Sequence, residues 1–228
     1  KDETVPMQRT MIYRAGCLLA VLLSCGSRAL CAQESQLPQE SQVATPVVAA
    51  APAFATVHVL VHTSFGDVRL ALEKERAPLT TANFLRYVDQ KRFDGATFYR
   101  AVKLDEEGRY GLVQGGLKGD PKKVLKPVRH EAPFATGLSN VNGAVSMARG
   151  APGSAASDFF IVVGDLVSLD GKPDSDDPGY AVFGHVVEGM DVVKRIMEAP
   201  RSLDAPDPAM KGQMIAVPVR IQSVRRAD

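Results

Sequence analysis

Two stretches of the sequence carry residue types that could bind a phosphate group or a metal ion. The segment QGGLKG at 114–119 is rich in glycine, but it has neither the G-x-G-x-x-G spacing of a dinucleotide loop nor the Lys-Ser/Thr pair of a nucleotide phosphate loop. His58 and His62 fall on one face of an expected strand, and a metal site would need a third ligand that the nearby sequence does not offer. We therefore expect two solvated histidines and no nucleotide site.

Acidic and hydroxyl side chains suggest two other chemistries. The segment DGKPDSDDPG at 170–179 has four aspartates, but it lacks the spacing and the bidentate Glu of a hand-type calcium loop, so a polar turn is favoured. Ser154 and Ser157 lie in no nucleophile elbow, and no matched acid, base and nucleophile are visible. The sequence predicts no metal and no cofactor.

The composition excludes some classes of partner. The chain has 228 residues, of which 45% are hydrophobic and 23% charged, and its formal net charge is +1. A chain of this length can bury one sizeable core. Because the balanced charge lacks a basic excess, we expect no nucleic acid partner and no attraction to an anionic membrane surface.

Residues 1–32 have the character of a secretory signal preceded by a few extra residues. Two arginines precede the apolar run AGCLLAVLLSC at 15–25, which is short for a membrane span. Small residues at 29–32 favour cleavage near residue 32, whereas LLSC ending at Cys25 leaves lipid attachment as the alternative. All three cysteines lie in this leader, so the mature protein would contain no thiol.

A linker and a single domain are expected after the leader. Residues 33–55 are rich in Gln, Ser, Ala and Pro and repeat the tripeptide QES. This composition cannot bury enough apolar surface to fold, and it is typical of a flexible tether. We expect the folded domain to occupy residues 56–228.

Short alternating segments predict a mainly β domain. TVHVLVH at 56–62 and DVRLALE at 67–73 alternate apolar and polar residues and are joined by TSFG, which predicts a hairpin. Clusters of Gly, Pro and Asp separate the further expected strands, which are 97–102, 111–115, 143–148, 159–164, 180–186 and 215–224. Eight strands indicate a closed barrel or a sandwich.

Two segments have the spacing of amphipathic helices. PLTTANFLRYVDQK at 78–91 begins with Pro in its first turn, and MDVVKRIMEA at 190–199 ends before a Pro. The expected apolar sides contain Thr81, Phe84, Leu85 and Val88 in the first helix, and Val193, Ile196 and Met197 in the second. Such helices could close the two open ends of a small barrel.

Several motifs in order resemble one family. FYRAV at 98–102, VQGGL at 113–117, GAVSMARGAPGSAASDFFIVVGD at 143–165 and YAVFGHVVEGMDVV at 180–193 are similar to the matching segments of cyclophilin-type peptidyl-prolyl cis/trans isomerases. The resemblance extends over nearly the whole expected domain. The GYAVFG strand and the signal sequence are most similar to the exported bacterial branch, which implies a periplasmic protein.

The resemblance implies a closed eight-stranded antiparallel barrel capped by two α-helices, with a binding groove on its outer face. Met147, Phe160 and Leu169 would form an apolar pocket for a proline ring, with core packing as the alternative for Met147 and Phe160. Short side chains from 148 to 156 would let an extended peptide lie against the backbone. Phe159 would point into the core, because strand neighbours face opposite ways.

The resemblance also implies the catalytic residues. Arg100 matches the family's catalytic arginine, and Gln114 would hydrogen-bond to it and limit its rotamers. Rotation about an X–Pro bond has a barrier of about 18–20 kcal/mol, because the nitrogen lone pair is delocalised into the carbonyl. An arginine that donates to the prolyl nitrogen would compete for this lone pair in the twisted state.

Further binding positions follow from the resemblance, with some departures. Leu112 stands where Met or Leu is usual, Ala148 begins the small-residue stretch, and the backbone of Arg149 would hold the peptide. Three further positions depart from the family's usual residues. Asp158 replaces a common Gln, and Tyr180 replaces a frequent His and would supply aromatic surface that is lost where Ser168 replaces Trp or Phe.

An insertion alters one wall of the implied pocket. KLDEEGRYG at 103–111 is longer than the family's usual connection, and we expect this charged loop to bulge into solvent. It leaves Gly111 where the family has a pocket phenylalanine, three residues before Gln114. Tyr110 could fill that gap through a slip of one residue.

These predictions lead to one predicted function and two alternatives. We expect a monomeric, cofactor-free peptidyl-prolyl cis/trans isomerase that acts on proline-containing unfolded or extended polypeptides, reaching a membrane only if Cys25 carries a lipid. A non-catalytic proline-peptide-binding module or chaperone is the first alternative, motivated by Gly111 and Ser168. An interaction domain that docks a partner through the 103–111 insertion or the acidic 174–177 loop is the second.

Overall fold

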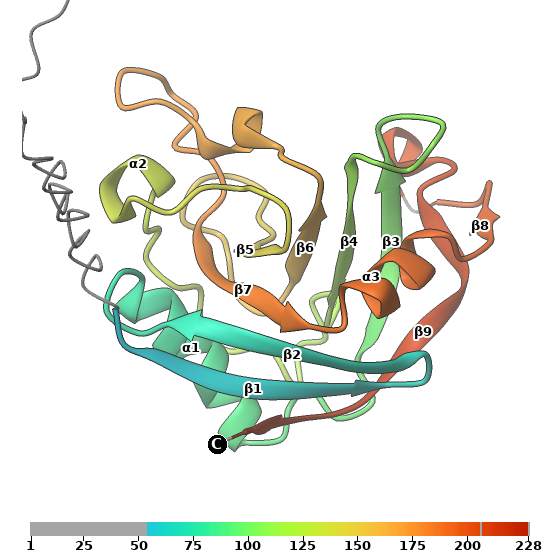
Figure 1. Cartoon of the computed structure of the whole chain (residues 1–228), viewed down its shortest axis with the longest axis horizontal. Helices are drawn as coiled ribbons and strands as arrows, with labels where there is room; N and C mark the ends of the chain where they lie inside the picture. The colour runs from blue at the N-terminus through green and yellow to red at the C-terminus, as the bar shows by residue number, and fades with distance from the viewer. Residues whose placement is uncertain (1–53, 206, 228) are drawn as a thin grey trace, which may run out of the picture. The chain divides into compact units, whose positions relative to one another are not determined.

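Nine strands form one antiparallel sheet among the residues that the computed structural model describes, 54–205 and 207–227 (Figure 1). The expected signal, and the expected linker except for its last two residues, lie outside the described residues. The strands are β1 (Thr56–Thr63), β2 (Gly66–Glu73), β3 (Thr97–Lys103), β4 (Gly111–Gly116), β5 (Ala144–Met147), β6 (Phe159–Val163), β7 (Val182–Glu188), β8 (Arg201–Ser202) and β9 (Met214–Arg226).

The sheet closes into a barrel. Its strand order is β1-β2-β7-β5-β6-β4-β3-β9-β8, and β1 also pairs with β9. Eight strands therefore form the barrel wall, and the two-residue β8 pairs with β9 beside it. Each expected strand is present, so the predicted eight-stranded barrel is confirmed and the sandwich is excluded. The short β8 is the strand that the sequence did not predict.

The first hairpin follows from its alternation. β1 and β2 pair in register from Thr56 opposite Glu73 to Thr63 opposite Gly66, so the three valines of β1 meet Leu72, Leu70 and Val68 of β2 on one face. This face is inside the barrel. The opposite face is solvated, and there the Nδ1 atom of His62 lies 2.8 Å from a carboxylate oxygen of Asp67.

Aromatic side chains fill the barrel interior. Ring centroids in this cluster lie 5.0 to 5.9 Å apart, and its members are Phe84, Phe93, Phe98, Phe159 and Phe183. All are at most 1% exposed. Because small barrels of this size are packed with side chains, the interior has no room for a peptide. A binding site must lie on the outside.

Helix α1 (Pro78–Asp89) begins where the sequence predicted, and it contributes one apolar side to the interior. Pro78 occupies the first turn, and the carboxylate of Glu131 accepts hydrogen bonds from the free backbone N–H groups of Leu79 and Thr80. The buried side includes Thr81, Phe84, Leu85 and Val88, as predicted. The helix packs against β2, β7 and β9.

Helix α3 (Met190–Met197) is the second expected helix. It buries Val192, Val193, Ile196 and Met197 and packs against β2, β3 and β4. The short helix α2 (Pro133–Thr136) and the 3-10 turns η1 (Val167–Asp170) and η2 (Pro208–Met210) were not predicted. No helix among the described residues combines the length and apolar character needed to cross a membrane.

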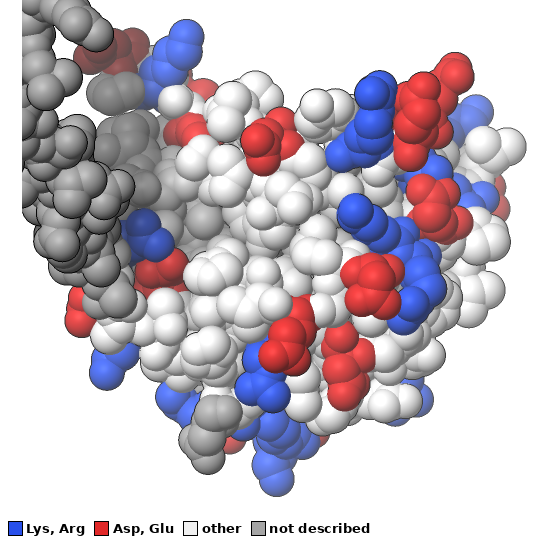
Figure 2. Space-filling view, in the orientation of Figure 1, with Lys and Arg blue, Asp and Glu red and all other residues white. Residues whose placement is uncertain are grey.

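Surface charges of both signs are interspersed on the face drawn in Figure 2. Several lie in local ion pairs, such as Arg195 with Asp191 at 2.8 Å and Arg109 with Asp105 at 2.9 Å. This mixture agrees with the small formal net charge of the chain.

Candidate active site

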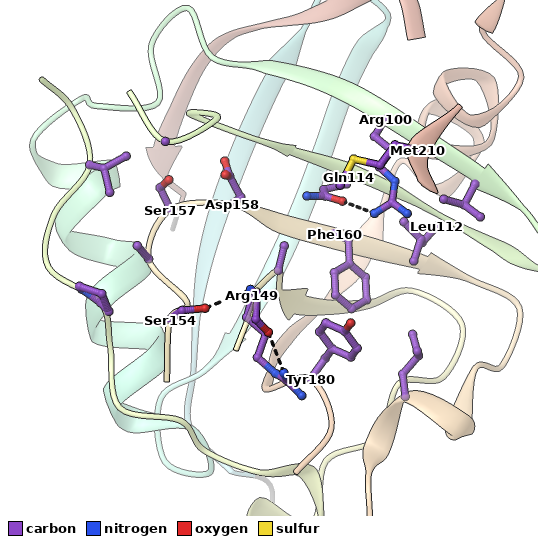
Figure 3. Close-up of a pocket in the computed structure, with 18 of the residues that line it drawn as sticks. Arg100, Leu112, Gln114, Arg149, Ser154, Ser157, Asp158, Phe160, Tyr180 and Met210 are labelled. Atoms are coloured by element: carbon purple, nitrogen blue, oxygen red, sulfur yellow. Dashed lines mark hydrogen bonds between the residues drawn. The ribbon is translucent and has the colours of Figure 1, made fainter. Parts of the chain in front are cut away.

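Three of the predicted site residues stand in one row across neighbouring strands. Arg100 on β3 lies opposite Gln114 on β4, which in turn lies opposite Phe160 on β6. Their side chains face outward and line an open cavity of about 600 Å³ (Figure 3). This volume is within the range of small-molecule and peptide pockets.

A β-bulge at Tyr99 turns Arg100 toward the outside. Phe98 pairs with Gly115 and Arg100 pairs with Gln114, so Tyr99 is an extra residue on β3. Phe98 and Ala101 are both fully buried in the interior, which leaves Tyr99 and Arg100 as consecutive outward residues. Strict alternation from Phe98 would have placed Arg100 inside the barrel. Bulges commonly redirect side chains in this way beside active sites.

Two glutamines hold the guanidinium of Arg100. Its Nη1 atom donates to Oε1 of Gln114 at 2.9 Å. Its Nε and Nη2 atoms both donate to Oε1 of Gln213, at 2.9 and 2.5 Å. The contact with Gln114 matches the sequence-based expectation. Gln213 was not predicted, since no local pattern connects a residue in the turn before β9 with one on β3.

Tyr99 orients the amide of Gln114. The Nε2 atom of Gln114 donates to the Tyr99 hydroxyl oxygen at 2.8 Å, which leaves Oε1 facing Arg100. Burial, and secondarily the charge of Asp158, raises the pKa of Tyr99 well above its usual value, so the phenol stays protonated. Tyr99 was missed because alternation alone does not predict that it shares a face with Arg100.

One end of the cavity is an apolar hollow. Phe160 forms its floor and is 3% exposed, and Leu112 and Leu169 pack against the same cluster. The ring of Tyr180 meets the ring of Phe160 edge to face, with centroids 5.4 Å apart. Tyr180 therefore provides the aromatic surface that the sequence predicted for it. Met210 lies at the same end, next to Arg100 and Leu112 in Figure 3.

The side chain of Arg149 holds the segment that carries Tyr180. Its Nε and Nη2 atoms donate to the backbone oxygen of Gly179, and Nη2 also donates to Asp177 at 2.6 Å. The guanidinium lies 4.8 Å from the centroid of the Tyr180 ring. The resemblance implied that the backbone of Arg149 would hold the peptide and that its side chain would matter less. The structure gives its side chain, which is 8% exposed, a supporting role.

The other end of the cavity is lined by short side chains. Ser154 and Ala156 lie here, as predicted for a surface that an extended peptide could approach, and Ala148 lines the cavity beside the Phe160 cluster. The hydroxyl of Ser154 accepts from Gly150 N–H and donates to the oxygen of Ala151, which closes the intervening turn. Ser154 thus has a structural role in this turn.

Asp158 places a carboxylate at this end of the cavity. Its Oδ1 atom accepts a hydrogen bond from the backbone N–H of Lys118 at 3.0 Å. Partial burial raises the pKa of Asp158, although the N–H bond opposes this effect. The groove therefore carries an acidic group where the family commonly has a neutral amide.

Met147 does not belong to the cavity, and its prediction as a pocket residue is wrong. Its side chain is 2% exposed and packs in the interior cluster. Met147 pairs with Phe159 across β5 and β6, and paired residues point to the same face of a sheet. Since Phe159 faces inward, Met147 does so too. The other nine predicted site residues all line the cavity.

The wall affected by the insertion is also built differently from the expectation. A side chain at Gly111 would meet the carbonyl oxygen of Val102 at 2.1 Å and the sulfur of Met197 at 2.9 Å, so this position faces inward. Tyr110 is 44% exposed and does not line the cavity, so its suggested slip does not occur. Val102 and Met210 line the cavity instead.

Hydrogen bonds account for two of the aspartates at 170–179. Asp170 accepts from the backbone N–H of Asn140 at 2.7 Å, and Asp177 accepts from Arg149. No cluster of three or more metal-ligating side chains was found among the described residues.

Together these features define a class of protein: a closed and filled barrel whose binding site is an outer groove with one held arginine beside an apolar hollow. The family model described as "Cyclophilin type peptidyl-prolyl cis-trans isomerase/CLD" matches residues 58–225. The chain therefore belongs to the cyclophilin-type peptidyl-prolyl cis-trans isomerases. The predicted family and its isomerase activity are confirmed at this level.

Individual relatives agree with this assignment. Peptidyl-prolyl cis-trans isomerase A of Dickeya dadantii is 40% identical over 159 residues, which cover 67% of this chain and 78% of that protein. Peptidyl-prolyl cis-trans isomerase B of Escherichia coli is 37% identical over 143 residues, covering 60% and 82%. A cyclophilin-type isomerase structure from Cryptosporidium parvum has a TM-score of 0.58 at 19% identity, covering 76% and 99%, and supports the fold.

Proposed function

We propose that this protein accelerates the rotation of X–Pro bonds in unfolded or extended polypeptides by donating a hydrogen bond from Arg100 to the prolyl nitrogen. The observation that carries this proposal is the held guanidinium beside the apolar hollow of Phe160. Membership of the isomerase family supports it. The ring of a substrate proline fits the chemistry of the hollow, and its flanking chain fits the short side chains beside it.

The hydrogen bonds of Arg100 leave donors free for a substrate. A guanidinium has five N–H groups, and the bonds to Gln114 and Gln213 use three of them, one each on Nε, Nη1 and Nη2. Five minus three leaves two, one on each terminal nitrogen. These two groups are the donors we assign to the peptide.

The donors act mainly on the twisted state. In a planar X–Pro amide the nitrogen lone pair is delocalised into the carbonyl, so the nitrogen is a poor acceptor. Rotation by about 90° localises the lone pair and makes a charge-assisted hydrogen bond from arginine possible. An interaction made only in the transition state raises the rate without tightening ground-state binding. Each 1.36 kcal/mol gained in this way speeds rotation tenfold.

Exchange NMR on a short X–Pro peptide tests the proposal directly. We expect the parent protein to speed exchange between the cis and trans signals. We expect Arg100→Ala to lower kcat by roughly a hundredfold, about 2.7 kcal/mol, with little change in KM. Arg86→Ala is the matched control, because Arg86 is exposed on α1, which does not contribute to the cavity.

Two results would reject parts of the proposal. If the parent protein does not speed exchange, the isomerase function fails for this chain. If Arg100→Ala is as active as the parent, the role given to Arg100 fails while the function stands.

A non-catalytic proline-binding module is the second candidate. It is favoured by the missing aromatic walls, since Gly111 faces inward and Ser168 is exposed. This candidate predicts peptide-induced shifts near Phe160 without exchange between cis and trans populations. The same NMR samples therefore decide between the two candidates.

We also propose that the protein is exported to the periplasm and acts there as a monomer. The signal-like segment at 15–25 and the small residues at 29–32 support export. Lipid attachment at Cys25 is the alternative to simple cleavage. Cell fractionation of the full chain and of Cys25→Ala tests this: cleavage predicts both in the soluble periplasmic fraction, whereas lipidation predicts that only the parent stays with membranes.

A further inference from the structure

Gln213 is attached to the active site by its main chain as well as by its side chain. Its backbone oxygen accepts a hydrogen bond from the N–H of Ala101, the residue after Arg100, at 2.9 Å. Its own backbone N–H donates to the oxygen of Met210 at 3.0 Å. The backbone of Gln213 is thereby fixed between β3 and the turn that contains η2.

The carboxamide of Gln213 is held in one orientation. Its Nε2 atom donates to the backbone oxygen of Ala209 at 3.1 Å, so Oε1 faces the opposite way, toward Arg100. The turn itself is capped, because the carboxylate of Asp207 accepts from the N–H of Ala209 at 2.9 Å. A capped turn, one backbone bond to β3 and one side-chain bond thus fix the acceptor before any substrate binds.

The geometry of the acceptor suits a guanidinium. Oε1 of Gln213 takes the Nε and Nη2 donors, which lie on one edge of the plane, and Gln114 takes Nη1. Two separate contacts define both the position and the tilt of the plane. An arginine side chain has many rotamers of similar energy, and most of this rotamer entropy would otherwise be lost in the transition state.

The chemical nature of the acceptor matters too. A carboxylate at position 213 would hold the guanidinium equally well, but it would offset the positive charge that attracts the prolyl lone pair. A neutral amide oxygen orients Arg100 and leaves its charge intact. The same turn also places Met210 on the wall of the hollow, so it supports both the arginine and the pocket.

We propose that Gln213 is a positioning residue for catalysis, which acts through Arg100 and not through contact with the substrate. The inference rests on the proposed function of the groove, because it assigns a role within that reaction. It makes the 207–213 turn the second support of the active site, beside the neighbouring strand that carries Gln114.

The test replaces Gln213 with Leu, which has a similar size and no acceptor. We expect Gln213→Leu to lower kcat about tenfold, with KM nearly unchanged. The Arg100 Nε–H signal in the NMR spectrum of the protein should broaden through solvent exchange or disappear. Gln213→Glu keeps an acceptor with the same reach, and we expect it to retain this signal. Met210→Ala, on the same turn, should keep the signal and raise KM instead.

A double-mutant cycle separates positioning from a general effect on the turn. In an Arg100→Ala background, Gln213→Leu should have no further effect on kcat, because the group through which it acts is missing. An equal loss of kcat in both backgrounds would overturn the proposal. So would parent-like kcat in Gln213→Leu, or an unchanged Nε–H signal.

The NMR signal also distinguishes this inference from the proposed function. If the parent protein fails to speed X–Pro exchange, the catalytic role of Gln213 fails with the function. If the parent is active and Gln213→Leu keeps both its kcat and the Arg100 signal, only the inference is rejected.

Discussion

Phe159 and Phe160 are neighbours on β6, are almost equally buried, and belong to different parts of the protein. Phe159 is 0% and Phe160 3% exposed. Phe159 contacts Phe84, Phe93 and Phe98 in the interior, whereas Phe160 contacts Tyr180 and lines the groove. Burial therefore does not separate a core residue from a site residue in this barrel. The face of the strand does.

The two faces are also stabilised differently. The inner face is held by apolar contacts between residues that many strands bring to one centre, so each ring is surrounded. The outer face combines a smaller apolar cluster around Phe160 with hydrogen bonds between a few polar residues, such as Arg100 with Gln114 and Gln213. Substitutions inside should mainly change the free energy of unfolding, and those outside should mainly change catalysis.

The largest expected difference is between Phe159→Ala and Phe160→Ala. Removing Phe159 leaves a cavity inside a closed barrel, and we expect the free energy of unfolding to fall by about 3–5 kcal/mol. Removing Phe160 widens an open groove, so we expect a loss of roughly 1–2 kcal/mol, because less packing is lost, together with a higher KM. Urea denaturation and peptide exchange measure the two effects. Equal losses of stability would contradict the division between faces.

Met147 and Met210 provide a second comparison between an interior residue and a groove residue of the same type. Met147→Ala should lower the free energy of unfolding by about 2–5 kcal/mol, as for other buried methionines. Met210→Ala should lower it by less than about 0.5 kcal/mol, since Met210 lies in a surface turn, and should raise KM. If Met147→Ala changed KM and left stability unaltered, the inward placement of Met147 would be wrong.

The smallest predicted effect is the contribution of Asp158 to the pH dependence of stability. Burial raises the pKa of Asp158 in the folded protein, so between its unfolded and folded pKa the native state binds more protons than the unfolded state. Stability should therefore fall as pH rises through this window, and the penalty should persist at neutral pH. Asp158→Asn should remove this pH dependence and slightly raise stability at pH 7. Thermal unfolding at several pH values measures this pH dependence, and Asp204→Asn, at an exposed position, is the control.

Much of the fold could be predicted because its elements are specified locally. The alternation in 56–62 and 67–73 predicted the first hairpin, and the apolar spacing of 78–91 predicted α1 and its buried side. Each pattern depends only on how residues a few positions apart share a face. The closure of the sheet by pairing of β1 with β9 has no such local pattern, and the resemblance to a family was needed to choose a barrel.

Assigning site residues to a face of the sheet from the sequence was reliable where strand alternation holds and unreliable where it breaks. The resemblance to the family assigned Phe160 to the groove, and alternation then assigned its neighbour Phe159 to the core. For Met147, the resemblance to the family implied the groove, and the pairing with Phe159 that turns it inward is a tertiary contact that no local pattern shows. The outward direction of Arg100 depends on the bulge at Tyr99, and the sequence contains no signal for that extra residue.

The sequence by itself determined the strands, the main helices, the filled interior and the motifs that place the chain in its family. These depend on periodicity and on short residue patterns, which are local. Only the tertiary structure decided that Arg100 faces outward and that Gln213 accepts two of its hydrogen bonds. The two residues are 113 positions apart, and they meet because β9 closes the barrel against β3. Such a contact depends on how the whole sheet is paired, which no short stretch of sequence specifies.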